Sequence, residues 1–179
     1  FKEFLKFKNV SIDLKSDFTE NEKSVIIRLL SEYLKYGGLP EVVLVPESKK
    51  VEILQGYYNT VIRKDIIERF HIKSEENLKA LLRLLLNSSH YTISKLYDTL
   101  KSLQYEIGKT VIQTFINYIE TSYILYSVFV SSPKIKDQMQ CPRKVYFVDT
   151  GFISQLSTKF SDNKGRLYET VFFLELKRK

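Results

Sequence analysis

The stretch Thr92–Tyr123, TISKLYDTLKSLQYEIGKTVIQTFINYIETSY, decides the fold, because it holds two amphipathic helices separated by a short turn. Thr92 is suited to cap the first helix, and the turn QYEIG at residues 104–108 leads into the second. The inward stripes consist of Ile93, Leu96, Leu100 and Leu103 in the first helix and of Ile112, Phe115, Ile116, Ile119 and Tyr123 in the second. This spacing predicts a helix-turn-helix.

The segments on either side extend this pair into a larger module. Upstream, Ser74 can cap a leucine-rich helix that NSSHY, residues 87–91, brings to an end. Downstream, ILYSVFV at 124–130 and VYFVD at 145–149 read as strands, because β-branched and aromatic residues dominate them. The polar and basic residues 131–144 between them form the tip of a hairpin. Three helices followed by a hairpin are the order of a winged helix, which we expect over residues 74–149.

The first 73 residues predict a helical segment with a rigid corner. Thr19 and Glu22 match a capping box at the start of a helix. The string YGGLPEVVL, residues 36–44, ends that helix, since Gly37 and Gly38 supply turn conformations and Pro40 cannot continue a helix. A long helix with a buried stripe follows over 49–70.

The last 30 residues, 150–179, also read as helical, with one helix running from Gly165 to the end. The predicted fold class is therefore mainly α: a helical segment over 1–73, a winged helix-turn-helix of three helices and a β-hairpin, and a C-terminal helix. Both ends look cut, because the chain opens on Phe1 and closes inside an amphipathic helix. We expect a piece of a longer protein.

Composition narrows the classes of function. No apolar run approaches the length of a membrane helix, and no signal peptide opens the chain, so we expect a cytoplasmic protein with no membrane partner. One cysteine and two histidines make no metal-ligand set. The 28 lysines and arginines exceed the 21 acidic residues, and the net charge of +7 favours approach to a polyanion. A solvated basic surface would give the same composition.

Two groups of residues are candidates for contact with double-stranded DNA. The outer face of the helix over 109–123 is polar and can donate hydrogen bonds to base edges in a major groove. The hairpin tip is basic and suits phosphates. The candidates are Lys109, Gln113, Thr114 and Asn117 on the helix, and Lys134, Lys136, Arg143 and Lys144 in the hairpin. The alternative is that both groups are solvated or dock on another protein.

Three short strings imitate catalytic motifs, and we assign no catalytic residue to any of them. GKT at 108–110 lacks the glycine of a phosphate-binding loop, because Leu103 stands there. Asp149 in VDTG is expected to cap the end of a strand, since aspartic protease chemistry needs two facing carboxylates. ELK at 175–177 lies on a predicted helix, whereas the nuclease motif of that form needs a strand.

Five strings in order resemble the C-terminal half of a family of archaeal and bacterial AAA-type ATPases. They are FKEFLKF at 1–7, EYLKYGGLPEVVL at 32–44, YYNTVIRKDIIER at 57–69, PRKVYFVDTGF at 142–152 and GRLYETVFFLELKRK at 165–179. The resemblance spans essentially the whole chain. It implies a P-loop ATPase core upstream, which would bind ATP and Mg²⁺, and a restriction-endonuclease-like domain that begins at residues 150–179.

The resemblance also assigns residues. It implies that Gly37, Gly38 and Pro40 form the corner of a lid packed on the nucleotide-binding core. It implies that Glu169 is the carboxylate on the first helix of the nuclease-like domain, whose remaining metal-binding residues would lie beyond Lys179. In one place the sequence departs from the family pattern, because Gln104 stands where a glycine is usual in the turn.

These observations predict a lid and a DNA-binding or regulatory winged helix of an archaeal-type ATPase. The chain by itself would hydrolyse nothing, and it would hold no cofactor or metal of its own. Its partners would be the ATPase core and double-stranded DNA. The alternative is a protein-protein interaction module of the same ATPase with no DNA contact.

Overall fold

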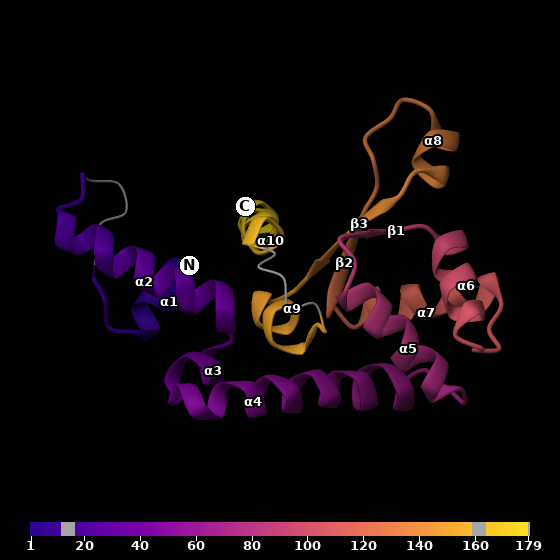
Figure 1. Ribbon diagram of the computed structural model, residues 1–179, viewed down its shortest axis with the longest axis horizontal. Coiled ribbons are helices and arrows are strands. Elements are labelled where there is room, and N and C mark those ends of the chain that lie inside the picture. Colours follow the sequence, from indigo (N-terminus) through magenta and orange to yellow (C-terminus); the bar gives the residue numbers. More distant parts are fainter. Residues whose placement is uncertain (12–16, 159–163, 179) are drawn as a thin grey trace. The chain divides into compact units, whose positions relative to one another are not determined.

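The structure is a computed structural model that describes residues 1–11, 17–158 and 164–178. The chain forms two compact units. The first comprises Phe1–Tyr57, Asp149–Leu156 and the last helix, and the second comprises chiefly Tyr58–Val148. Helices dominate both, and the second also contains a three-stranded antiparallel sheet. The prediction of a mainly α fold is therefore confirmed (Figure 1).

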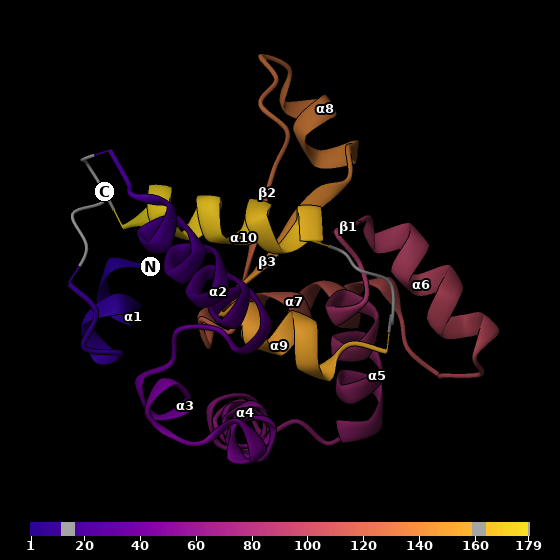
Figure 2. The same ribbon diagram turned by 60° about the vertical axis from the view of Figure 1, so that its left-hand side comes forward.

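The first unit is built on the long helix α2. Its elements are α1 (Lys2–Phe7), α2 (Glu20–Tyr36), α3 (Pro40–Leu44), the first part of α4 (Glu47–Thr60), α9 (Thr150–Leu156) and α10 (Lys164–Lys177). Helices α9 and α10 both contact α2 (Figure 2). Burial of apolar surface holds this layer together. The small core consists of Phe4, Leu5, Leu29, Tyr33 and Val43, with the Phe4 and Tyr33 rings packed edge to face.

The predicted capping box is present at the start of α2. The Glu22 backbone N–H donates to Thr19 Oγ1 at 3.3 Å, and the Thr19 backbone N–H donates to Glu22 Oε2 at 2.9 Å. These two bonds satisfy donors that the first turn of a helix leaves without partners. The Thr19 hydroxyl also donates to Glu22 Oε2, at 2.7 Å. This bond and the one from the Thr19 backbone N–H lower the pKa of Glu22, because both favour the charged carboxylate.

The second unit combines several helices with the sheet. Its elements are the end of α4, the π-helical segment η1 (Val61–Glu68), α5 (Glu75–Leu86), β1 (His90–Tyr91), α6 (Ile93–Ser102), α7 (Lys109–Thr121), β2 (Leu125–Val128), α8 (Ile135–Gln140) and β3 (Arg143–Phe147). All α5 leucines except Leu84, and the isoleucines of α7, are almost completely buried and form its core. The helix expected over 49–70 is present as α4 and η1, and its last turns widen to the π form.

The sheet has the order β1, β3, β2, with both pairs antiparallel. The register sets Leu125 opposite Phe147, and Tyr91 opposite Arg143. The predicted hairpin is therefore present as β2 and β3, which run out from the three helices to α8 in Figure 1. The two-residue strand β1 was not predicted, because His90 and Tyr91 are too short a run to show alternation.

Four details of the sequence prediction were wrong. Leu103 is 57% exposed because α6 ends at Ser102, and Tyr123 is 69% exposed because α7 ends at Thr121. Each lies just beyond the helix whose stripe it was assigned to. The Ser74 side chain makes no capping hydrogen bond. The tip of the hairpin is not a simple loop, since α8 forms within it.

The two compact units divide the chain within α4, whereas the predicted ranges 1–73, 74–149 and 150–179 divide it later. In the structure, Asp149–Leu156 and α10 belong to the same unit as Phe1–Tyr57. Those three ranges stay a prediction of domain organisation.

Candidate nucleic-acid interface

The turn between α6 and α7 is closed by backbone hydrogen bonds. Helix α6 ends at Ser102, and Gln104 follows in the left-handed conformation, at φ +64°. The Tyr105 N–H donates to the Leu100 carbonyl at 3.0 Å and the Gln104 N–H to that of Lys101 at 3.0 Å, which is a Schellman end. Gln104 therefore occupies the position that glycine usually takes, at some cost in backbone strain.

A second bond ties this turn to the rest of the unit. The Asn77 side-chain amide on α5 donates to the Glu106 carbonyl at 3.0 Å. Gly108 then starts α7 in an extended conformation, and a Cβ on it would meet nothing within 4 Å. The end of α6 and the hydrogen bond to α5 thus determine the conformation of the turn. The backbone conformation of Gly108 does not require a glycine.

Helix α7 presents the predicted polar face outward. Its apolar face is buried against the core, and Lys109 and Asn117 are exposed on the other side. The Gln113 amide donates to Asn117 Oδ1 at 3.2 Å, and Thr114 Oγ1 donates to the Thr110 carbonyl at 3.0 Å. Gln113 and Asn117 are held side by side, where their amides could turn to an external partner.

Lys109 is drawn toward α6. Its ammonium donates to Ser94 Oγ at 3.3 Å and lies 5.2 Å from the centre of the Tyr97 ring. Both contacts are at an exposed site and are individually weak. Ser94 and Tyr97 were not singled out in the sequence, although each lies on the outer side of α6. They place the Lys109 charge over the junction of the two helices.

The four basic hairpin residues fall into two pairs. Lys134 and Lys136 are exposed at the start of α8, and Lys134 forms the N-cap position of that helix. A hydrogen bond from Ser132 Oγ to Asp137 at 3.3 Å steadies the same turn. Arg143 and Lys144, predicted at the hairpin tip, are the first residues of β3. The sheet therefore fixes their backbones.

Aromatic rings hold Arg143 in place. Its guanidinium lies 4.3 Å from the centre of the Phe129 ring and 6.0 Å from that of Tyr91. Tyr91 shares a hydrogen bond with Ser127 at 2.9 Å, so the ring is itself fixed. Sequence reasoning missed Tyr91 and Phe129 because their contact with Arg143 depends on strand pairing.

The predicted lid corner is a tight junction within the first unit. Gly37 has φ +79°, and Pro40 is the first residue of α3. The Asp149 carboxylate accepts from the Gly38 N–H and from the Gly151 N–H, at 2.8 Å each. A Cβ on Gly37 would lie 1.6 Å from Asp149 Oδ1, which leaves no room for a side chain. The strings GGLPE and VDTG thus meet in one corner.

Asp149 caps the start of α9 through the Gly151 N–H, whereas the sequence analysis expected it to cap the end of a strand. It is 7% exposed, and burial raises its pKa to about 6. The backbone N–H groups of Gly38, Gly151 and Leu39 favour the charged form and oppose that rise. Thr150 adds a further link by donating from its hydroxyl to the Tyr33 carbonyl at 3.0 Å.

Glu169 lies in α10 of the first unit and is half-buried. Within residues 1–11, 17–158 and 164–178, no three His, Cys, Asp or Glu side chains gather as metal ligands. The role that the ATPase resemblance gives to Glu169 stays a prediction. In the same ranges, no helix is both long enough and apolar enough to cross a membrane.

Comparison with known proteins places the chain in a family. Residues 27–163 match the family described as a domain of unknown function, DUF8612, and the chain belongs to it. It is 34% identical over 182 aligned residues to an uncharacterized protein of Methanocaldococcus jannaschii, and 28% identical over 181 to one of Haemophilus influenzae. All of the chain aligns, but it spans only 40% and 43% of those relatives. No solved structure matches it.

Proposed function

We propose that the chain supplies a DNA-binding winged helix and the helical lid of a larger archaeal-type P-loop ATPase. The observation that carries the DNA-binding part is the combination, in one compact unit, of a helix-turn-helix with a polar outer face and a hairpin with basic residues. Phosphate contacts by the hairpin would set affinity, and the amides of α7 would read bases.

The order of elements supports the winged-helix assignment. A first helix, a short strand, two helices joined by a tight turn, and a hairpin follow one another from α5 to β3. Strand β1 pairs with β3, so the sheet closes beside the helix-turn-helix. This arrangement leaves α7 as the helix that would enter a major groove, as the second helix of such pairs does.

The charges around α7 and the hairpin support contact with a polyanion. Lys134 and Lys136 are exposed, and Arg143 is oriented by two aromatic rings. An oriented arginine loses less freedom when it binds a phosphate than a mobile one does. Only Asp137 opposes these charges within the hairpin, and it already accepts from Ser132.

The lid assignment rests on the corner formed by Gly37, Gly38 and Asp149, together with the resemblance in sequence. The relatives are more than twice as long as the chain, which leaves room in them for an ATPase core and a nuclease-like domain. In such a protein, the nucleotide state of the core would shift the lid and thereby reposition the winged helix. ATP and Mg²⁺ would bind the core. Under the same resemblance, Glu169 would belong to the nuclease-like domain.

The test is a titration of the chain against duplex DNA at several salt concentrations. We expect affinity to fall steeply with salt, and the charge reversal K134E/R143E to reduce both affinity and slope. Changing Gln113 to alanine should cost about 1 to 3 kcal/mol on a preferred sequence only. The matched control K2E/R28E, in the first unit, removes the same charge from exposed lysine and arginine positions. An equal effect of both double variants would show that net charge alone, and not the hairpin, accounts for the attraction to DNA.

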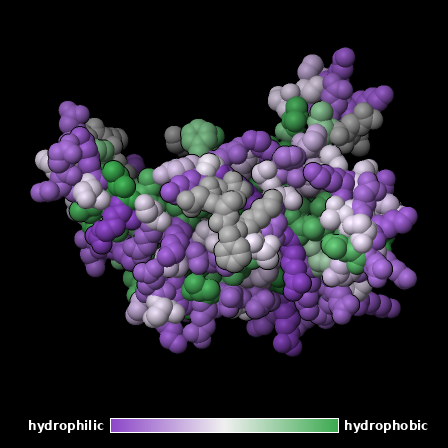
Figure 3. Space-filling model, in the orientation of Figure 1, coloured by the Kyte–Doolittle hydropathy of each residue, from purple (hydrophilic) through white to green (hydrophobic). Residues whose placement is uncertain are grey.

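Exposed apolar residues on the hairpin favour a second function, contact with a protein partner. Phe129, Val130 and Ile135 are 47%, 46% and 73% exposed. Figure 3 shows green, apolar atoms on this projecting part of the surface. Apolar area of this kind is more common at protein interfaces than at phosphate contacts. Absence of DNA binding at low salt would favour this second function over the first.

A further inference from the structure

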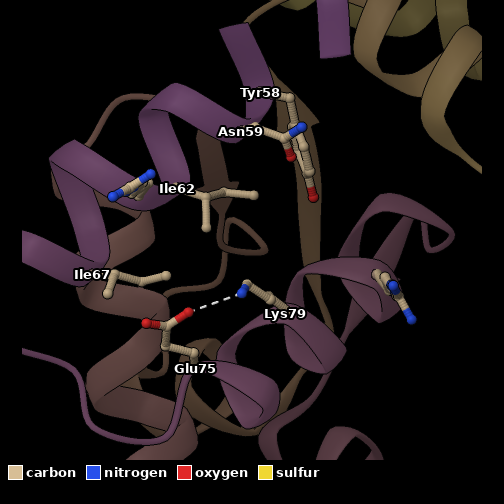
Figure 4. Close-up of a pocket in the computed structure, with 8 residues that line it drawn as sticks. Tyr58, Asn59, Ile62, Ile67, Glu75 and Lys79 are labelled. Carbon is tan, nitrogen blue, oxygen red and sulfur yellow. Dashed lines mark hydrogen bonds and ion pairs between the residues drawn. The ribbon is translucent and has the colours of Figure 1, made fainter. Parts of the chain in front are cut away.

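A pocket of about 490 Å³ opens in the second unit, between the end of α4 with η1 on one side and α5 on the other. It lies apart in sequence from α7 and from the hairpin. Tyr58, Ile62 and Ile67 form its apolar part, and Arg63, Lys79 and Arg83 bring three cations to it. In Figure 4 the Tyr58 hydroxyl and the Lys79 ammonium both point into the open space. Its volume is in the range of small-molecule sites.

The three cations of the pocket differ in whether they are paired among residues 1–11, 17–158 and 164–178. Lys79 pairs with Glu75 at 2.9 Å, and Arg63 with Glu68 at 3.2 Å, both at exposed positions. Exposed pairs of this kind are weak and exchange readily for another anion. In the ranges of the chain that the structure describes, the Arg83 guanidinium makes no ion pair or hydrogen bond. It therefore keeps its full capacity to bind an anion in two-point fashion.

The wall opposite α5 is the π-helical segment Val61–Glu68. Such segments are rare and are frequently found at functional sites. The wider turn moves side chains out of the regular helical order. Here the segment sets buried Ile62 and Ile67 on the pocket side while Arg63 remains exposed. The Arg83 charge also lies near enough to Tyr58 to oppose the rise that burial causes in the pKa of the phenol, to about 12.

We propose that this pocket binds a small phosphate monoester with an apolar or aromatic body. Arg83 and Lys79 take the phosphate, Arg63 adds charge at the rim, and the Tyr58 ring with Ile62 and Ile67 receives the body of the ligand. Arginine suits this role because its planar donors match phosphate oxygens. Glu75 repels the ligand and competes for Lys79, so it limits the affinity.

The same phosphate chemistry exists in the diester backbone of nucleic acid, and the test separates the two sources. The chain is titrated at low salt with phenyl phosphate, inorganic phosphate and duplex DNA, and amide NMR shifts locate each site. We expect phenyl phosphate to saturate a site whose shifts centre on Tyr58, Ile62 and Lys79, and to bind about tenfold more tightly than inorganic phosphate.

Three variants sharpen the result. We expect R83Q to weaken phenyl phosphate binding by about tenfold, E75Q to strengthen it severalfold, and the matched control R28Q in the first unit to leave it unchanged. Arg83 and Arg28 are both exposed, so R83Q and R28Q should keep the wild-type melting temperature. R83Q should not alter DNA affinity beyond the loss that R28Q causes.

Four outcomes would overturn the proposal. They are the absence of saturable phenyl phosphate binding, equal affinity for inorganic phosphate, an equal effect of R83Q and R28Q, and a loss of DNA binding specific to R83Q. The last would identify the pocket as a contact for the nucleic-acid backbone. These results are separate from those of the hairpin variants, so either proposal can fail alone.

Discussion

Two glycines in the chain show how differently the same residue can act. Gly37 has φ +79° and ψ −165°, a region that residues with a Cβ hardly enter, and its Cβ would overlap the Asp149 carboxylate. Gly56 lies inside α4, where a Cβ would meet nothing within 4 Å. Gly37 is required because of its backbone conformation and its contact with Asp149. Gly56 weakens α4, and the structure shows no contact that requires a glycine there.

We therefore expect opposite effects from one substitution. Gly37→Ala should lower the free energy of unfolding by at least about 2 kcal/mol, because it combines a strained backbone with a displaced carboxylate. Gly56→Ala should raise it by about 0.5 to 1 kcal/mol. Denaturant unfolding of both variants against the wild type measures this. A neutral Gly37→Ala would show that the corner can open cheaply.

The sequence prediction about this corner was right in kind and imprecise in position. The sequence analysis assigned turn conformations to both Gly37 and Gly38, but only Gly37 among the described glycines has a positive φ. Gly38 instead gives its N–H to Asp149 and packs against the Tyr33 ring. The partner of the corner lies 111 residues away, and local pattern alone does not reveal such a contact.

Asp149 gives the fold a pH dependence whose sign follows from its burial. Its pKa rises from 3.8 to about 6 on folding, so folding favours the protonated acid. Its contribution is fully present below about pH 4 and is lost as the pH rises through about 6. Relative to Asp149→Asn, the wild type should lose on the order of 3 kcal/mol across that window. Urea unfolding at pH 4, 5, 6 and 7 tests this, and parallel pH profiles would contradict it.

At the scale of elements, the turn after α6 carries strain that a glycine would relieve. Gln104 is left-handed at the C′ position of a Schellman end, where residues other than glycine pay a conformational cost. Gln104→Gly should raise the free energy of unfolding by about 0.5 to 1 kcal/mol. Ser102→Gly, at the last residue of α6, should lower it, by less than the cost of a glycine in a helix interior. Equal destabilisation by both would indicate that the Gln104 side chain makes a contact of its own in solution.

Helices were predicted well from sequence, and their ends and small additions were not. The apolar spacing in α5, α6 and α7 is strong, and Thr92 accepts from the Lys95 N–H as a cap should. Strand β1 was not predicted because it is defined by its pairing with β3 and not by a local sequence pattern. Helix α8 was not predicted because its apolar content is low. Its N-terminal turn is held by hydrogen bonds of Ser132 with Asp137 and with the Lys134 N–H.

The candidate interface was predictable in composition and not in geometry. All eight proposed DNA contacts are hydrophilic, and this was read directly from the sequence. The orientation of Arg143 by Phe129 and Tyr91 depends on the register of three strands. The pocket beside η1 was not anticipated, since Tyr58 and Ile62 were read only as part of a buried stripe. Nothing in the amino-acid spacing separates a π-helical segment from an α-helix.

For the whole chain, we expect no ATP hydrolysis. It lacks a glycine-rich phosphate loop with its lysine, and it lacks an apolar strand that ends in paired acids. Steady-state release of phosphate from ATP by the purified chain is the measurement, with the K109Q variant as a check on the GKT string. Turnover that disappears in K109Q would reverse our reading of that string.

The corner at Gly38 and Asp149 also constrains the order in which the chain can be assembled during synthesis. The first unit is interrupted in sequence, because its α9 and α10 follow the whole of the second. A ribosome would therefore release Tyr58–Val148 before the first unit has all of its parts. Closing an unstructured loop of 111 residues would cost about 4 kcal/mol in chain entropy. If Tyr58–Val148 folds first, most of that loop is already ordered when Asp149 reaches Gly38. The entropy cost of closing the corner is then lower, because synthesis has completed the inserted unit before the first one.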